Sequence, residues 1–264
     1  MLKINNVSKT FNGGTINEKV ALSGVNLHLA PGDFVTVIGG NGAGKSTLLN
    51  LTAGVYSCDS GSVVLDNVDI TRQPEYKRAA LLGRVFQDPM RGTAADMGIE
   101  ENLAMAFRRG KRRGLRWGIT KAEREDYVQR LAVLGLGLET RLSSKVGLLS
   151  GGQRQALTLL MATLQKPKLL LLDEHTVALD PKTAAKVLEI TENIVARDKL
   201  TTLMVTHNMK DAIRLGNRLI MMHEGNIIFD ISGDEKKNLH VKDLLEKFEK
   251  ASGDEFANDR MILN

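Results

Sequence analysis

The chain of 264 residues contains a single cysteine, Cys58, which excludes an internal disulfide and favours a reducing compartment. It also lacks a long hydrophobic run, because the most apolar stretch, Leu169 to Leu172, is far too short to span a bilayer. Neither sign of charge dominates: 36 Lys and Arg stand against 31 Asp and Glu, for a formal charge of +5. This balance favours anionic partners mildly and does not separate nucleotides, lipid headgroups and nucleic acid. The length allows a core without metal or disulfide staples, so small stapled scaffolds are excluded.

Short apolar and β-branched segments alternate with helical patterns along much of the chain. The predicted strands are 34–38, 63–65, 169–172, 202–205 and 219–222. The later strands alternate with helices, such as the one predicted at 182–197, and this order favours a parallel sheet. Val25, Leu27 and Leu29 alternate with polar residues, which indicates a half-exposed antiparallel strand near the N-terminus.

The strand pattern is interrupted between about residues 88 and 165. Here Tyr127, Leu131, Leu134 and Leu138 recur at helical spacing, and we expect an inserted helical lobe. The tail from Asp234 is charged, with one amphipathic stretch at 241–248, and we expect its last dozen residues to be mobile.

A glycine-rich segment from Gly39 to Ser46 fits the pattern G-x-x-x-x-G-K-[ST], directly after the strand 34–38 and before a helical segment. The glycines let consecutive N–H groups approach phosphate oxygens, and the helix N-terminus adds its dipole. Lys45 adds a charge, the Ser46 hydroxyl can ligate Mg²⁺, and Thr47 can donate to a further phosphate oxygen. A chance glycine-rich turn is the alternative, and the flanking strand and helix argue against it.

Two carboxylates follow the apolar strand 169–172, at the edge where open parallel sheets place ligands. Asp173 suits Mg²⁺ coordination through water, and Glu174 suits a general base that polarises an attacking water. A strand ending in Asp-Glu would by itself be a plain solvated strand end. Its pairing with the phosphate-binding segment makes nucleotide hydrolysis the better hypothesis.

A helix begins within Leu149–Gln153, which reads Leu-Ser-Gly-Gly-Gln. Ser150 with Gln153 three residues on matches a capping box, which is the structural alternative. The double glycine, Gly151 and Gly152, exposes N–H groups at the helix start and favours a second phosphate-binding surface. With this segment the chain resembles the nucleotide-binding subunits of ATP-binding cassette (ABC) transporters, whose signature motif it is and whose other motifs follow the same order.

The resemblance covers about residues 1–230 and implies the P-loop NTPase fold of the α/β class. This fold has a RecA-like, mostly parallel sheet, an N-terminal antiparallel β subdomain and an inserted helical signature subdomain. The implied organisation is one ABC ATPase domain over 1–264, with the ATP-binding core at 1–87 and 166–230, the helical subdomain at 88–165 and a C-terminal tail at 231–264. ATP and Mg²⁺ are the implied cofactors, and the implied reaction is hydrolysis of ATP to ADP and phosphate.

The resemblance also assigns residues that mean little alone. Gln87 matches the Q-loop glutamine, which contacts Mg²⁺ and the attacking water, although an isolated Gln is normally a surface amide. His207 resembles the switch histidine at the γ-phosphate, and its alternative is a hydrogen-bonded structural residue. Asp180 matches the D-loop, which reaches across a dimer interface. Phe11 takes the place of the aromatic residue that stacks on adenine, usually Tyr, and a core Phe is the competing interpretation.

The expected site combines these motifs. The expected catalytic residues are Glu174, His207, Gln87 and Lys45; the expected nucleotide-binding residues are Phe11, Gly39, Asn41, Gly42, Gly44, Lys45, Ser46, Thr47, Ser150, Gly151, Gly152, Gln153 and Asp180; the expected Mg²⁺ ligands are Ser46, Gln87 and Asp173.

Three positions depart from the common family pattern. Gly40 replaces the usual Pro or Ser of the phosphate loop, and the helix after the signature, 156–162, lacks the usual arginine near its end. His175 replaces the usual Pro after the catalytic glutamate. This variant is similar to a subgroup of bacterial importer ATPases that serve a substrate-binding lipoprotein, some of them linked to aromatic amino acids.

The resemblance implies partners as well. A head-to-tail homodimer would hold each ATP between Lys45 of one chain and Ser150 of the other. We expect transmembrane permease subunits, an extracytoplasmic solute-binding protein, a location at the cytoplasmic face of the membrane, and import of a small solute such as an amino acid. The alternative is an ATPase that drives a mechanical, signalling or extrusion complex. An ABC ATPase of DNA repair or translation would need a coiled-coil insertion or a second cassette, so we expect no nucleic-acid partner.

A basic segment at 108–117 holds six Lys and Arg, no acid, and Trp117. A solvated loop is the default interpretation. Contact with anionic headgroups is the functional alternative, and nucleic-acid binding has weak support from one aromatic residue.

Overall fold

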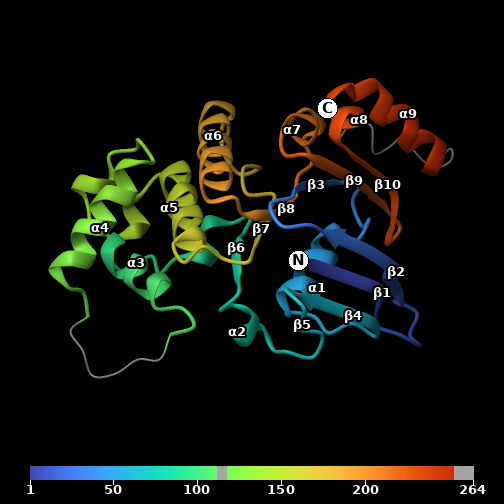
Figure 1. The fold of residues 1–264 in the computed structure, drawn as a ribbon, viewed down its shortest axis with the longest axis horizontal. Helices are drawn as coiled ribbons and strands as arrows, with labels where there is room; N and C mark the ends of the chain where they lie inside the picture. Colours follow the sequence, from blue (N-terminus) through green and yellow to red (C-terminus); the bar gives the residue numbers. More distant parts are fainter. Residues whose placement is uncertain (112–117, 253–264) are drawn as a thin grey trace. The chain divides into compact units, whose positions relative to one another are not determined.

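The computed structural model describes residues 1–111 and 118–252. The chain divides into two compact units, one formed by Met1–Arg78 with Leu200–Asn264 and the other by Ala79–Lys199 (Figure 1). The helical segment expected at 88–165 lies wholly inside the second unit. Residues 112–117 of the basic segment and the last dozen residues lie outside the described residues, so the expectations for them stay expectations. No helix within the described ranges is long and apolar enough to cross a membrane.

An antiparallel sheet forms the N-terminal part of the first unit. Its strands are β1 (Leu2–Phe11), β2 (Lys19–Leu29), β4 (Ser60–Leu65) and β5 (Val68–Asp69), in the order β2-β1-β4-β5. Alternation buries Leu2 and Ile4 of β1 and leaves Lys3 exposed, as expected for a strand with one face on the core. The predicted N-terminal antiparallel element is confirmed.

The rest of the first unit is built on a second set of strands, in the order β10-β9-β3-β8. The strands are β3 (Phe34–Ile38), β8 (Thr201–Val205), β9 (Arg218–His223) and β10 (Asn226–Ser232). β3 is parallel to both β8 and β9, and all five of its residues are buried, which is typical of a central parallel strand. The helices of this unit are α1 (Lys45–Ala53), α2 (Glu75–Arg78), α7 (Met209–Arg214), α8 (Gly233–Lys237) and α9 (Val241–Ser252).

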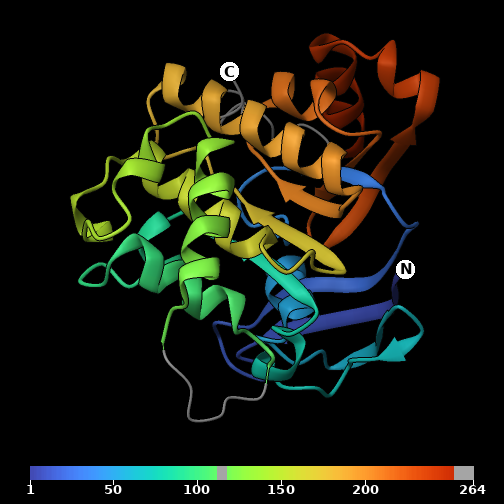
Figure 2. The same cartoon turned by 60° about the vertical axis from the view of Figure 1, so that its left-hand side comes forward.

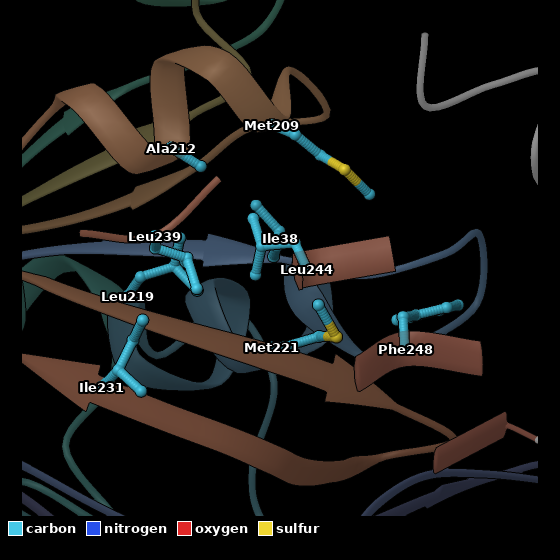
Figure 3. Close-up of a cluster of buried hydrophobic side chains, with 9 residues drawn as sticks. All are labelled: Ile38, Met209, Ala212, Leu219, Met221, Ile231, Leu239, Leu244 and Phe248. Carbon is cyan, nitrogen blue, oxygen red and sulfur yellow. The ribbon is translucent and has the colours of Figure 1, made fainter. Parts of the chain in front are cut away.

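The amphipathic stretch of the tail is helix α9, and its apolar face completes a hydrophobic cluster of the first unit (Figure 3). Leu244 and Phe248 pack with Ile38 of β3 and Met221 of β9, and the Phe248 ring meets the His223 ring edge to face at 5.6 Å. The start of the tail is therefore part of the folded core.

The second unit places helices against a parallel strand pair (Figure 2). β6 (Leu82–Val85) and β7 (Leu169–Asp173) are parallel, with Leu82 opposite Leu169. The helices are α3 (Ile99–Phe107), α4 (Lys121–Ala132), α5 (Gly151–Thr163) and α6 (Pro181–Asp198), with short 3₁₀ turns at Pro89–Gly92, Leu138–Thr140 and Val146–Leu148. The residues predicted to share the apolar face near α4 are buried, including Tyr127 and Leu131. Helix α5 contacts α3, α4, α6 and β6, so it forms the centre of this unit.

Candidate nucleotide-binding site

The phosphate loop of the first unit joins β3 to α1 and is closed by its own lysine. The buried Lys45 ammonium donates to the carbonyls of Gly39 and Gly40, at 2.7 and 2.9 Å. Gly44 precedes α1 with φ of 100°, a left-handed conformation that favours glycine. No side chain of the described residues caps the N-terminus of α1, whereas Ser150 and Asp180 cap α5 and α6. A helix start without a side-chain cap is of the kind that binds anions, and the role of these amide groups in binding phosphate stays a prediction.

Two of the loop glycines are also required by packing. A Cβ built on Gly39 would lie 2.2 Å from the Met222 carbonyl oxygen, and one on Gly44 would lie 2.5 Å from the Ala21 carbonyl oxygen. Both contacts are with backbone, which cannot move aside as a flexible side chain can. The loop is thus held between β9 and β2, so its N–H groups have a fixed direction.

His207 lies at the same edge of the strands as the phosphate loop. β3 and β8 are parallel with Val37 opposite Val205, so Gly39 and His207 each stand two residues beyond the same pair. The Thr206 N–H donates to the Val37 carbonyl at 3.1 Å, which fixes the backbone just before the histidine. His207 is half-buried.

Phe11 ends β1 and is half-buried, so it is not part of the buried core. Its ring meets the Tyr56 ring edge to face at a centroid distance of 5.2 Å, and the Lys9 ammonium lies 5.6 Å from its centroid. The contact with Tyr56 orients the Phe11 ring, and a half-buried aromatic ring at a strand end is of the kind on which a nucleobase stacks.

In the second unit, the ends of β6 and β7 bring Gln87 and Glu174 to one edge. Val85 lies opposite Leu172, and Gln87 and Glu174 each follow two residues later. Asp173, the last residue of β7, is 3.7 Å from the guanidinium of Arg84 on β6. Glu174 has φ of 46°, which turns the chain sharply at the end of the strand.

The segment from Glu174 to Asp180 is attached to α6 at both ends. The buried His175 Nε2 lies 3.1 Å from the Thr191 hydroxyl, which itself donates to the Val187 carbonyl at 2.8 Å. The Thr191 hydroxyl hydrogen is donated to Val187, so the hydroxyl can only accept from His175, and Nε2 is the donor. Burial lowers the pKa of His175 to about 4.

At its other end, this segment passes into α6 through Asp180. Its carboxylate accepts from the Thr183 N–H at 3.1 Å and caps the helix. Hydrogen bonds from the Thr183 hydroxyl and backbone lower the pKa of the Asp180 carboxyl. The exposed Asp180 carboxylate is therefore ionised and fixed in direction.

The signature segment forms the capping box that the sequence offered as the structural alternative. Ser150 Oγ accepts from the Gln153 N–H at 3.3 Å, and Gln153 Oε1 accepts from the Ser150 N–H at 3.2 Å. The double glycine serves packing too, because a Cβ on Gly152 would lie 2.1 Å from Thr183 Cγ2 and one on Gly151 would lie 3.2 Å from Leu179. The start of α5 is thus packed against the segment that follows Glu174.

Gln155 was not predicted from the sequence, yet it is fully buried on α5 and supports the backbone just before Gln87. Its side-chain amide donates to the Phe86 carbonyl at 3.1 Å, next to Gln87 and 69 residues away in the chain. Arg84, the ion-pair partner of Asp173, was not predicted either. The apolar periodicity of α5 predicts that Gln155 faces the core, and a polar side chain at such a position would have been the signal.

One unit carries a phosphate loop, and the other carries a strand that ends in two carboxylates and a glycine-rich helix start; each feature is typical of an α/β nucleotide-binding protein. The sequence model of the family described as ABC transporter matches residues 22–177, and the chain belongs to that family. The family shows that the chain is the ATP-binding subunit of an ABC transporter and an ATPase, as the resemblance implied.

The relatives extend over most of the chain. It is 45% identical to the tyrosine transport ATP-binding protein of Clostridioides difficile (strain R20291), over 95% of this chain and 100% of the relative. It is 35% identical to the thiamine import ATP-binding protein ThiQ of Yersinia pseudotuberculosis, over 77% of this chain and 81% of the relative. A dimeric post-hydrolysis structure of the ATP-binding cassette MJ0796 bound to ADP and Pi is similar with a TM-score of 0.75, at 30% identity and covering 88% and 98% of the two chains. The predicted fold class is thereby confirmed.

Proposed function

We propose that this ABC ATPase powers the import of an amino acid, in the aromatic class, through a separate membrane permease. The observation that carries the proposal is the 45% identity to a tyrosine transport ATP-binding protein along that relative's full length. His175, in the position that resembles the importer subgroup, supports the same assignment.

The roles of the site residues follow from their chemistry. We assign the phosphate loop, with Lys45, Ser46 and Thr47, to the polyphosphate of ATP, and Phe11 to the adenine. Glu174, at the sharp turn after β7, polarises the attacking water, and His207 contacts the γ-phosphate. Gln87 orients the water from the end of β6.

The donor set suits Mg²⁺ bound together with nucleotide. Among residues 1–111 and 118–252 no group of three or more His, Cys, Asp or Glu could hold a metal ion alone. Ser46, Gln87 and Asp173 instead supply a hydroxyl, an amide and a carboxylate, all hard oxygen donors, and Mg²⁺ in such sites takes its other ligands from phosphate and water. When bound, the ion would neutralise charge that develops on the phosphate oxygens.

A second copy of the chain completes each ATP site in this proposal. Ser150, Gly151, Gly152 and Gln153 of one copy face the nucleotide held by Lys45 of the other, and Asp180 lies at the interface between the copies. The exposed, ionised Asp180 and the exposed helix start at Gly151 support this role because both groups are accessible to a partner.

The complex would sit at the cytoplasmic face of the membrane, with permease subunits and an extracytoplasmic solute-binding protein. To test this, we would tag the chain in its native cell, solubilise membranes gently and identify the co-purifying proteins by mass spectrometry. The isolated complex would then be placed in proteoliposomes with ATP on the side of this subunit, and uptake of labelled tyrosine, phenylalanine and thiamine would be compared.

A polytopic permease and ATP-dependent uptake of an aromatic amino acid are the expected results. The Glu174→Gln complex is the matched control, since it should assemble without transporting. A partner with few membrane spans, no binding protein and no uptake would instead support the mechanical or extrusion alternative.

A further inference from the structure

Strand β2 runs along the phosphate loop and fixes one side of it. Its Ala21 carbonyl lies against Gly44, and its Ser23 N–H donates to the Gly225 carbonyl at 3.0 Å. Gly225 in turn donates to the Ala43 carbonyl of the loop at 3.1 Å. These backbone contacts fix the position of the β2 backbone beside the loop.

Lys19 is the first residue of β2, and the strand directs it to the loop. Lys9 pairs with Leu22 and Thr10 with Val20, so Ala21 is the extra residue of a β-bulge, which re-aims the strand beyond it. Beyond the bulge Lys19 lies opposite Phe11, so both side chains leave the same face of the sheet. The Lys19 ammonium would be 3.2 Å from a Cβ built on Gly42, and Gly42 has φ of 79°.

The charge of Lys19 is not neutralised by a neighbour, in contrast to the other cations here. Lys9 pairs with Asp59 at 2.7 Å, and the Lys45 ammonium is buried and bonded to loop carbonyls. Lys19 is exposed, and among the described residues no Asp or Glu carboxylate forms an ion pair with it. An exposed ammonium beside a phosphate-binding loop is a charge that a polyphosphate can use.

We propose that Lys19 binds a phosphate oxygen of the nucleotide. In this arrangement the Lys19 ammonium lies between the base, which stacks on Phe11, and the phosphates, which the loop holds. The proposal rests on the roles proposed for Phe11 and the phosphate loop. It makes Lys19 a determinant of nucleotide affinity that selects charged nucleotides over nucleosides, because an ammonium gains from a phosphate and gains little from a neutral ribose.

The test compares Lys19→Met with Lys3→Met, which removes an exposed lysine from the other end of the same sheet. The full-length chain would be titrated with ATP and ADP by calorimetry, and adenosine would be measured by competition. We expect Lys19→Met to weaken ATP and ADP binding about tenfold and adenosine binding not at all, with Lys3→Met unchanged. Lys19→Arg should keep most of the affinity for ATP, because it keeps the positive charge. Added salt should reduce the difference in ATP affinity between Lys19→Met and the wild type, because salt screens the interaction of the ammonium with phosphate.

Two results would overturn the assignment. The first is an unchanged ATP affinity in Lys19→Met. The second is a loss of adenosine affinity as large as the loss of ATP affinity, which would place the effect on the Phe11 surface. Lys45→Ala distinguishes this from failure of the proposed site. If that variant also binds ATP normally, the phosphate-loop role itself is wrong, whereas loss in Lys45→Ala alone rejects only Lys19. Thermal unfolding of each variant verifies that it folds.

Discussion

Glu174 carries the clearest prediction for a single residue. Replacement by Gln keeps the shape but removes the base, so turnover should fall about 10²- to 10⁴-fold while ATP binding persists. Phosphate release measures turnover, and calorimetry measures ATP affinity. The exposed Glu189→Gln on α6 is the matched control and should leave both unchanged. Normal hydrolysis by Glu174→Gln would remove this residue from the general-base role.

His175 predicts a pH dependence of stability. Its pKa is lowered from 6.5 to about 4 by burial, so the unfolded chain binds the proton first as the pH falls. Stability that is present above pH 6.5 is therefore lost as the pH drops toward 4, and the loss from pH 7 to pH 5 should be about 2 kcal/mol. Urea unfolding of wild type and His175→Gln at both pH values measures it, because Gln keeps a donor for Thr191 and does not titrate. Parallel pH profiles for the two proteins would contradict the prediction.

At the scale of the element, one contact limits the size of the side chain that fits at the start of α5. Gly152→Ala places a methyl 2.1 Å from Thr183 Cγ2, and the resulting overpacking should lower the free energy of unfolding by about 1–3 kcal/mol. Thr183→Ser removes that methyl and should restore most of the loss in the double variant. Gly118→Ala, with no atom within 4 Å of its Cβ, is the control and should change stability little. Failure of the second substitution to rescue would show that the cost lies elsewhere.

The elements themselves follow from local patterns, whereas their side-chain contacts do not. The apolar run Phe34–Ile38 becomes β3 because burial on both faces requires it, and the amphipathic tail stretch becomes α9 because its apolar face has a sheet to cover. Gln155 bonds to Phe86 across 69 residues, and the β-bulge at Ala21 directs Lys19 to Gly42. Neither contact produces a periodic pattern in the sequence, because each depends on the position of backbone that is distant in the chain. The residues of the proposed site could be named from the sequence because phosphate binding requires particular residue types at fixed spacings, and such a spacing is visible in the sequence alone.

At the scale of the whole molecule, the central prediction is that each ATP is shared between two chains. In the Glu174→Gln background, Lys45→Ala removes the phosphate contact of its own chain, and Ser150→Arg blocks the surface offered to the partner. Each double variant alone should trap no ATP in a dimer. A mixed dimer, however, pairs the intact Lys45 of one chain with the intact Ser150 of the other and so contains one complete site.

Gel filtration with labelled ATP should thus show a nucleotide-loaded dimer only after the two double variants are mixed. If a site were built within one chain, mixing would restore nothing, although Glu174→Gln alone still trapped ATP.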